Sequence, residues 1–126
     1  MEKTSPVFSC TYRFIIWLLG ETENFPKSER FRMARRLEDA AFDLYSKLAK
    51  AAHSANPLFE LKEADHLLAM LRLYLRLSYD RHLLKIGQYE HGAEMLVEVG
   101  RLLGGWMKKV GPAPKVEQDL CTQEGA

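Results

Sequence analysis

The start of one predicted helix carries a row of basic side chains, which are suited to binding an anion. Phe31, Ala34 and Leu37 recur at helical spacing, and Ser28 precedes them as a typical N-cap. The same turns hold five cations, opposed only by Glu29: Lys27, Arg30, Arg32, Arg35 and Arg36. Because a helix N-terminus already bears partial positive charge, these cations cost stability unless an anion binds them. The alternative is a solvated face whose arginines pair with nearby acids.

Four amphipathic segments must position these cations. Helical periodicity predicts them over residues 6–24, 27–55, 59–86 and 89–110. Pro6 can open the first helix, Pro57 ends the second, and Gly87 is a natural C-cap for the third. Long helices with short connections pack best as an all-α, antiparallel up-down-up-down four-helix bundle. We therefore expect a bundle domain over residues 1–111 and a flexible tail over residues 112–126.

In that topology, the start of the second helix and the end of the third lie at the same end of the bundle. We predict that the basic side chains gathered there bind nucleic-acid phosphates, because the planar fork of arginine can hold two phosphate oxygens. Arg72 and Arg76 are one turn apart and should point the same way, with Tyr79 beside them. Some members of the set pair instead with acids such as Asp80. The predicted binding residues are Arg30, Arg32, Arg35, Arg36, Arg72, Arg76, Arg81 and Lys85.

Apolar residues exceed what one core stripe per helix requires. The surplus consists of Phe14, Ile16, Trp17, Met70, Leu73, Leu77, Leu84, Val99, Leu102 and Trp106. Leftover apolar surface usually marks a protein interface, so we expect a homo-oligomer. The alternative is a single wide core face on each helix. Gly100 and Gly104 are one turn apart and predict close helix packing, and we expect Trp106 to be buried against the first helix or a neighbouring subunit.

Composition limits the class of protein. The chain has 126 residues, 47% hydrophobic and 28% charged, which is typical of one globular domain. The net charge is only +1, so any anion-binding surface must arise from local segregation of charge. Cys10 and Cys121 lack metal or redox spacing, which favours a reduced, cytoplasmic protein. The apolar run over residues 14–19 is too short to span a bilayer and lacks signal-peptide features.

Catalytic and metal-binding patterns are weak. Glu63 and His66 have the Glu-x-x-His spacing of carboxylate-bridged metal bundles, but such sites need two of these pairs and two further glutamates. The sequence contains no glycine-rich phosphate loop and no nucleophile elbow. We therefore predict a protein that is not an enzyme, with no catalytic residue, no metal and no cofactor.

Three segments of the sequence resemble the accessory variability determinant (Avd) family. They are the run from Phe25 to Phe31, the segment from Leu61 through Tyr74, and the closing run from Gly100 to Trp106. Avd proteins are accessory proteins of diversity-generating retroelements and are related to the four-helix proteins of ribosomal RNA intervening sequences. The resemblance implies a four-helix protomer in a pentameric barrel. It also implies partnership with a reverse transcriptase and contact with nucleic acid during mutagenic copying of a template RNA.

The sequence is consistent with three hypotheses for the function. The first is a nucleic-acid-binding accessory protein of a reverse transcriptase. The second is an oligomeric interaction module whose basic end serves only solubility. The third is a metal enzyme built on a helical bundle. Binding that weakens with salt separates the first from the second, and metal analysis of the purified protein decides the third.

Overall fold

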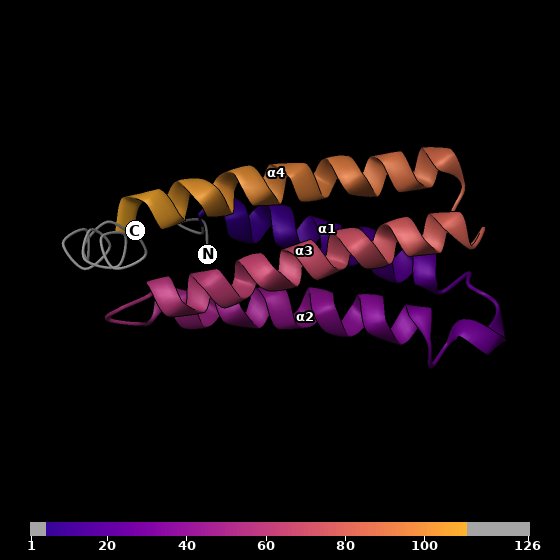
Figure 1. The fold of residues 1–126 in the computed structure, drawn as a ribbon, viewed down its shortest axis with the longest axis horizontal. Helices are drawn as coiled ribbons and strands as arrows, with labels where there is room; N and C mark the ends of the chain where they lie inside the picture. The colour runs from indigo at the N-terminus through magenta and orange to yellow at the C-terminus, as the bar shows by residue number, and fades with distance from the viewer. Residues whose placement is uncertain (1–4, 111–126) are drawn as a thin grey trace, which may run out of the picture.

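The computed structural model describes residues 5–110, and within this range the chain forms four α-helices and no strand. The all-α prediction is therefore confirmed (Figure 1). The elements are α1 (Pro6–Thr22), the short 3-10 helix η1 (Lys27–Glu29), α2 (Met33–Ala52), α3 (Leu58–Asp80) and α4 (Ile86–Val110). The predicted tail over residues 112–126 and Cys121 lie outside the described range.

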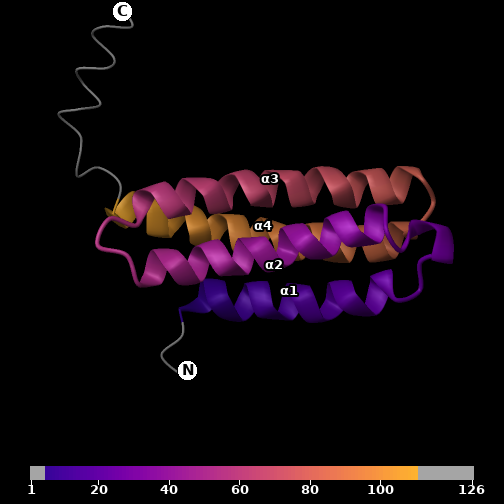
Figure 2. The same cartoon turned by 90° about the horizontal axis from the view of Figure 1, so that it is seen from below.

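Each helix packs against two others. α1 and α3 both contact α2 and α4, so α1 and α3 occupy diagonal positions. Figures 1 and 2 show the four helices side by side along the long axis, with η1 and the α3–α4 connection at the same end. Within residues 5–110, no helix has both the length and the apolarity needed to cross a membrane.

Leucine side chains from all four helices build the core. The largest fully buried side chains include Leu18, Leu37, Leu44, Leu48, Leu61, Leu68, Leu71, Leu75, Leu96 and Leu103. Each such burial stabilises the fold by about 1.5–3 kcal/mol relative to an exposed side chain. Of the predicted surplus residues, Phe14, Leu84 and Val99 belong to this core, whereas Ile16, Leu73 and Leu77 are exposed. The core faces are therefore wide, and some apolar surface also remains exposed. Whether that surface forms a contact between subunits stays a prediction.

The start of α2 differs from the prediction. Ser28 lies within η1, α2 begins at Met33, and the N-cap residue Arg32 makes no side-chain cap. The carboxylate of Glu29 instead accepts a hydrogen bond from the Met33 amide at 3.5 Å. Pro26 is the N-cap residue of η1, and its fixed φ suits the start of this short turn. Phe31 consequently falls between the two elements and is exposed, rather than lying in the core stripe.

The end of α3 also comes earlier than predicted. His82 has a left-handed backbone with φ of 66°. The amide of Leu83 donates to the Ser78 carbonyl at 2.8 Å, and the His82 amide donates to the Tyr79 carbonyl at 2.9 Å. These two bonds form the arrangement that usually places glycine at the left-handed position. Gly87, the predicted C-cap, instead lies in the first turn of α4.

The predicted close packing at small residues of α4 is confirmed at Gly100 but not at Gly104, and Gly92 is a further close-packed position. A Cβ on Gly92 would lie 2.5 Å from the ring of Trp17, whereas nothing lies within 4 Å of a Cβ on Gly104. Gly100 faces the flexible guanidinium of Arg72. Trp106 is half-buried and lies 6.1 Å from Phe8 of α1 between ring centroids, so the predicted contact with the first helix is confirmed.

Candidate nucleic-acid interface

Glu29 joins the start of α2 to the end of α3. Its side chain is 5% exposed, and its carboxylate accepts a hydrogen bond from the Arg81 guanidinium at 3.0 Å. The guanidinium of Arg32 lies 3.6 Å from the same carboxylate oxygen. One buried carboxylate therefore brings the guanidinium groups of Arg32 and Arg81 close together.

A shallow hollow of 330 Å³ opens beside this ion pair. It is lined by Glu29, Phe31, Arg32, Met33, Arg36 and Arg81. Three guanidinium groups therefore border the hollow, against one carboxylate. Arg36 forms no ion pair with any residue of the described chain. The hollow thus has an excess of positive charge and arginine donors that can take an oxyanion.

The pKa of Glu29 shows that this carboxyl is ionised at neutral pH. Burial alone raises its pKa, but the hydrogen bond from Arg81, the amide of Met33 and the charges of Arg32 and Arg81 together lower it below the ordinary value of 4.5. The carboxylate therefore remains charged where it orients the arginines.

The turn before α2 places an aromatic ring at the edge of the hollow. Phe31 is 70% exposed, and the guanidinium carbon of Arg35 lies over its ring at 5.3 Å from the centroid. This is within the range of a cation–π contact. Arg30, one residue before the ring, is exposed in the same turn. Arg35 therefore lies beside a residue that lines the hollow, and Arg30 precedes that residue in the chain.

A second basic group lies along α3 on its α4 side. Arg72 points to Gly100 of α4, and Arg76 pairs with Asp80 at 3.1 Å. Beside them the rings of Tyr79 and Tyr89 stack, with 5.1 Å between centroids. The predicted proximity of Arg72, Arg76 and Tyr79 on one part of α3 agrees with these contacts.

The eight predicted residues thus fall into separate groups. Arg32, Arg36 and Arg81 share the hollow, and Arg35 lies over the Phe31 ring at its edge. Arg30 is exposed in the turn before Phe31, Arg72 points to Gly100 of α4, and Arg76 pairs with Asp80. Lys85 is exposed in the connection before α4, where its amide donates to the Gln88 side chain at 2.7 Å. Whether any of the eight binds nucleic acid stays a prediction.

Sequence reasoning does not identify two residues of this surface. From the sequence, Glu29 is only an opposing acid, and Phe31 is a core residue. A signal for Phe31 is present in the sequence, because it is an isolated aromatic residue between Arg30 and Arg32 just after a proline-led turn. The sequence contains no comparable signal for Glu29, because its partner Arg81 is 52 residues away.

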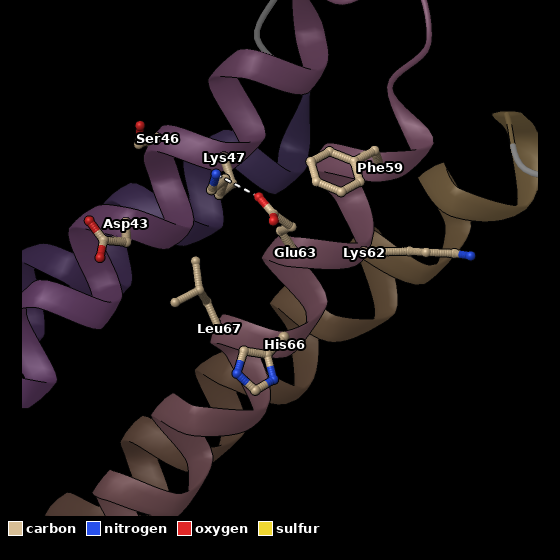
Figure 3. Close-up of a pocket in the computed structure, with 8 residues that line it drawn as sticks. All are labelled: Asp43, Ser46, Lys47, Phe59, Lys62, Glu63, His66 and Leu67. Carbon is tan, nitrogen blue, oxygen red and sulfur yellow. Dashed lines mark ion pairs between the residues drawn. The ribbon is translucent and has the colours of Figure 1, made fainter.

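A second hollow lies between α2 and α3 and has a volume of 830 Å³. Figure 3 shows its main polar contact: the carboxylate of Glu63 points toward Lys47, and the two groups are 2.6 Å apart. Lys47 also lies 4.0 Å from Glu60. The hydrogen bond to Glu63, followed by smaller electrostatic contributions, raises the pKa of Lys47 despite partial burial, so this lysine is protonated.

Glu63 and His66, the pair with Glu-x-x-His spacing, both line this second hollow. Because the Glu63 carboxylate is engaged by Lys47, it is occupied by an ion pair rather than directed at His66 (Figure 3). Within residues 5–110, no three His, Cys, Asp or Glu side chains are grouped so that they could hold a metal ion.

These features define a class: a four-helix protein whose arginines gather around one buried carboxylate at the end where α2 begins. A family model described as bAvd-like matches residues 7–110. Since the match covers most of the chain, the protein belongs to the bAvd-like family, and the resemblance seen in the sequence is confirmed. No curated protein matches the chain with significant similarity.

Proposed function

We propose that this protein is a non-enzymatic, cytoplasmic accessory protein of a diversity-generating retroelement. It binds nucleic acid and a reverse transcriptase and supports mutagenic copying of a template RNA. Membership of the bAvd-like family supports this function. The observation that carries the nucleic-acid part is the hollow in which Arg32, Arg36 and Arg81 surround a single carboxylate. Repeated arginines with spare donors are typical of phosphate binding, which is independent of base sequence.

The proposed assembly is a ring of antiparallel up-down-up-down protomers, and the resemblance favours five. Exposed apolar side chains support a ring, because five of the ten large ones within residues 5–110 form two different stripes. Tyr12, Ile16 and Leu19 recur at helical spacing on α1, and Leu73 and Leu77 recur on α3. Since α1 and α3 are diagonal in the bundle, the stripes lie on different sides of the protomer. A head-to-tail contact between two unlike faces generates a ring when the rotation closes.

In a ring, the basic hollow lined by Arg32, Arg36 and Arg81 would also be repeated in every subunit. Each subunit presents one copy, so contacts that are weak singly add along a bound strand. This is how a chain with a net charge of only +1 can still bind a polyanion.

Co-purification tests the proposed function. The protein is co-expressed with the reverse transcriptase encoded beside it, and the tagged protein is captured with and without nuclease treatment. The proposal predicts recovery of the transcriptase together with nucleic acid. Absence of both from the captured material contradicts it.

The second candidate is an oligomeric interaction module that binds no nucleic acid. The pairing of Arg32 and Arg81 with Glu29, and of Arg76 with Asp80, favours it, because paired arginines contribute less positive potential. Nucleic-acid affinity that falls steeply with salt supports the first function, and absence of binding supports the second.

A further inference from the structure

We propose that the hollow at the start of α2 binds unpaired nucleotides, with Phe31 stacking on a base and the neighbouring arginines holding the adjoining phosphate. This inference rests on the proposed function and deepens it, because it names the form of nucleic acid that the basic end binds. Single-strand binding sites combine a basic groove with aromatic side chains on which bases stack. The hollow has both components, because Phe31 lines it together with Arg32, Arg36 and Arg81.

The aromatic component is the exposed ring of Phe31. The ring is 70% exposed because Phe31 lies between η1 and α2, outside both elements. The Arg35 guanidinium covers one face at 5.3 Å, and a base stacks on the face that remains. Single exposed apolar residues are common, but this one lines a hollow whose other lining residues include three arginines.

The phosphate component is the set of Arg32, Arg36 and Arg81. Glu29 accepts one hydrogen bond from Arg81 and lies close to Arg32, and each guanidinium has five N–H donors. Donors therefore remain for a phosphate on all three arginines. Because Glu29 positions the guanidinium groups of Arg32 and Arg81 before any ligand arrives, less ordering of these long side chains is needed on binding.

The geometry favours unpaired over paired nucleotides. In a duplex, each base is stacked between its neighbours, so its faces are closed to a protein ring, whereas unpaired bases can be splayed out and stacked on aromatic side chains. Arginines alone bind the phosphates of either form. The contribution of Phe31 should therefore appear only with single strands.

The test is fluorescence anisotropy with the full-length protein. The probes are an unstructured RNA oligonucleotide, the DNA of the same sequence, and the two corresponding duplexes. The proposal predicts that Phe31→Ala weakens binding of both single strands by about fivefold or more and leaves duplex binding unchanged. Phe59→Ala is the matched control, because Phe59 is 63% exposed and belongs to the other hollow (Figure 3).

Two further variants separate base stacking from a contact between protomers. Phe31→Tyr keeps an aromatic ring, and Phe31→Leu keeps apolar bulk without a stacking face. The proposal predicts parent-like single-strand affinity for Phe31→Tyr, and for Phe31→Leu a loss comparable to that of Phe31→Ala. Light scattering on each variant should give the oligomer mass of the parent.

The outcomes have distinct meanings. Equal affinity of the parent and Phe31→Ala for single strands overturns the inference while leaving the proposed function standing. Equal losses on single strands and duplexes also overturn it. If the parent binds none of the four probes, the proposed nucleic-acid function itself fails.

Discussion

Glu29 and Arg81 are 52 residues apart in the chain, and a hydrogen-bonded ion pair of 3.0 Å joins them. This contact ties η1 to the end of α3, and the hollow lined by Arg32, Arg36 and Arg81 opens beside it. Glu29 therefore holds two parts of the fold together. In the proposed function it also orients arginines whose remaining donors bind an anion.

The first prediction concerns the pH dependence of this ion pair. The pKa of Glu29 lies below its ordinary value of 4.5 in the folded protein, so its ionised form contributes stability above that pH. This contribution is lost as the pH falls through the folded-state pKa. Glu29→Gln should therefore melt at a lower temperature than the parent at neutral pH, and the difference should shrink on acidification. A difference in melting temperature that does not depend on pH contradicts this role for the charge.

Gly92 provides the second prediction. Its missing side chain makes room for Trp17, and a Cβ would come within 2.5 Å of the indole ring. Because the ring is rigid, Gly92→Ala should destabilise the protein by about 1–3 kcal/mol, measured by urea denaturation. Gly105→Ala is the control: nothing lies within 4 Å of its Cβ position, and alanine should stabilise the helix there by up to about 1 kcal/mol. Equal effects at the two positions contradict this account.

Periodicity is sufficient to predict the helices but not their ends. Leu61, Leu68, Leu71 and Leu75 repeat at helical spacing, and each is buried as the pattern requires. The ends depend on features with weaker local signals. His82 takes a left-handed conformation that glycine usually occupies, so α3 stops before the predicted C-cap.

The candidate site could be predicted only in outline. The expected chain topology brings the α2 start and the α3 end together, and that part agrees with the Glu29–Arg81 contact. The partition of the arginines could not be predicted, because it depends on which acid each one meets. Arg76 pairs within its own helix with Asp80, whereas Arg81 reaches across to Glu29.

The third prediction concerns Trp106. Its ring is half-buried beside Phe8, which also lies 5.5 Å from Tyr45 between ring centroids. Trp106→Ala should lower stability by about 2 kcal/mol, less than the loss expected for a fully buried ring. Trp106→Phe keeps an aromatic partner for Phe8 and should lose less. An unchanged melting curve for Trp106→Ala shows that these ring contacts contribute no stability.

The fourth prediction tests the proposed ring. If the α1 stripe of one subunit contacts the α3 stripe of the next, Ile16→Lys and Leu73→Lys should each yield monomers by light scattering. The Ile16→Lys variant keeps an intact α3 stripe, and the Leu73→Lys variant keeps an intact α1 stripe. An equimolar mixture should therefore form a heterodimer through these two stripes, and this dimer cannot add further subunits. A monomeric parent contradicts the ring, and homodimers of either variant alone indicate a contact between like faces.

The most direct test of the central claim is the dissociation constant of the parent for an unstructured RNA over a range of salt concentrations. We predict that affinity falls steeply with salt, and that Arg36→Ala flattens the logarithmic slope by about one unit for each phosphate that the variant no longer neutralises. The control is Arg101→Ala, because Arg101 is paired with Glu98 on α4 and lies outside the basic hollow. Absence of binding, or an affinity independent of salt, contradicts the account.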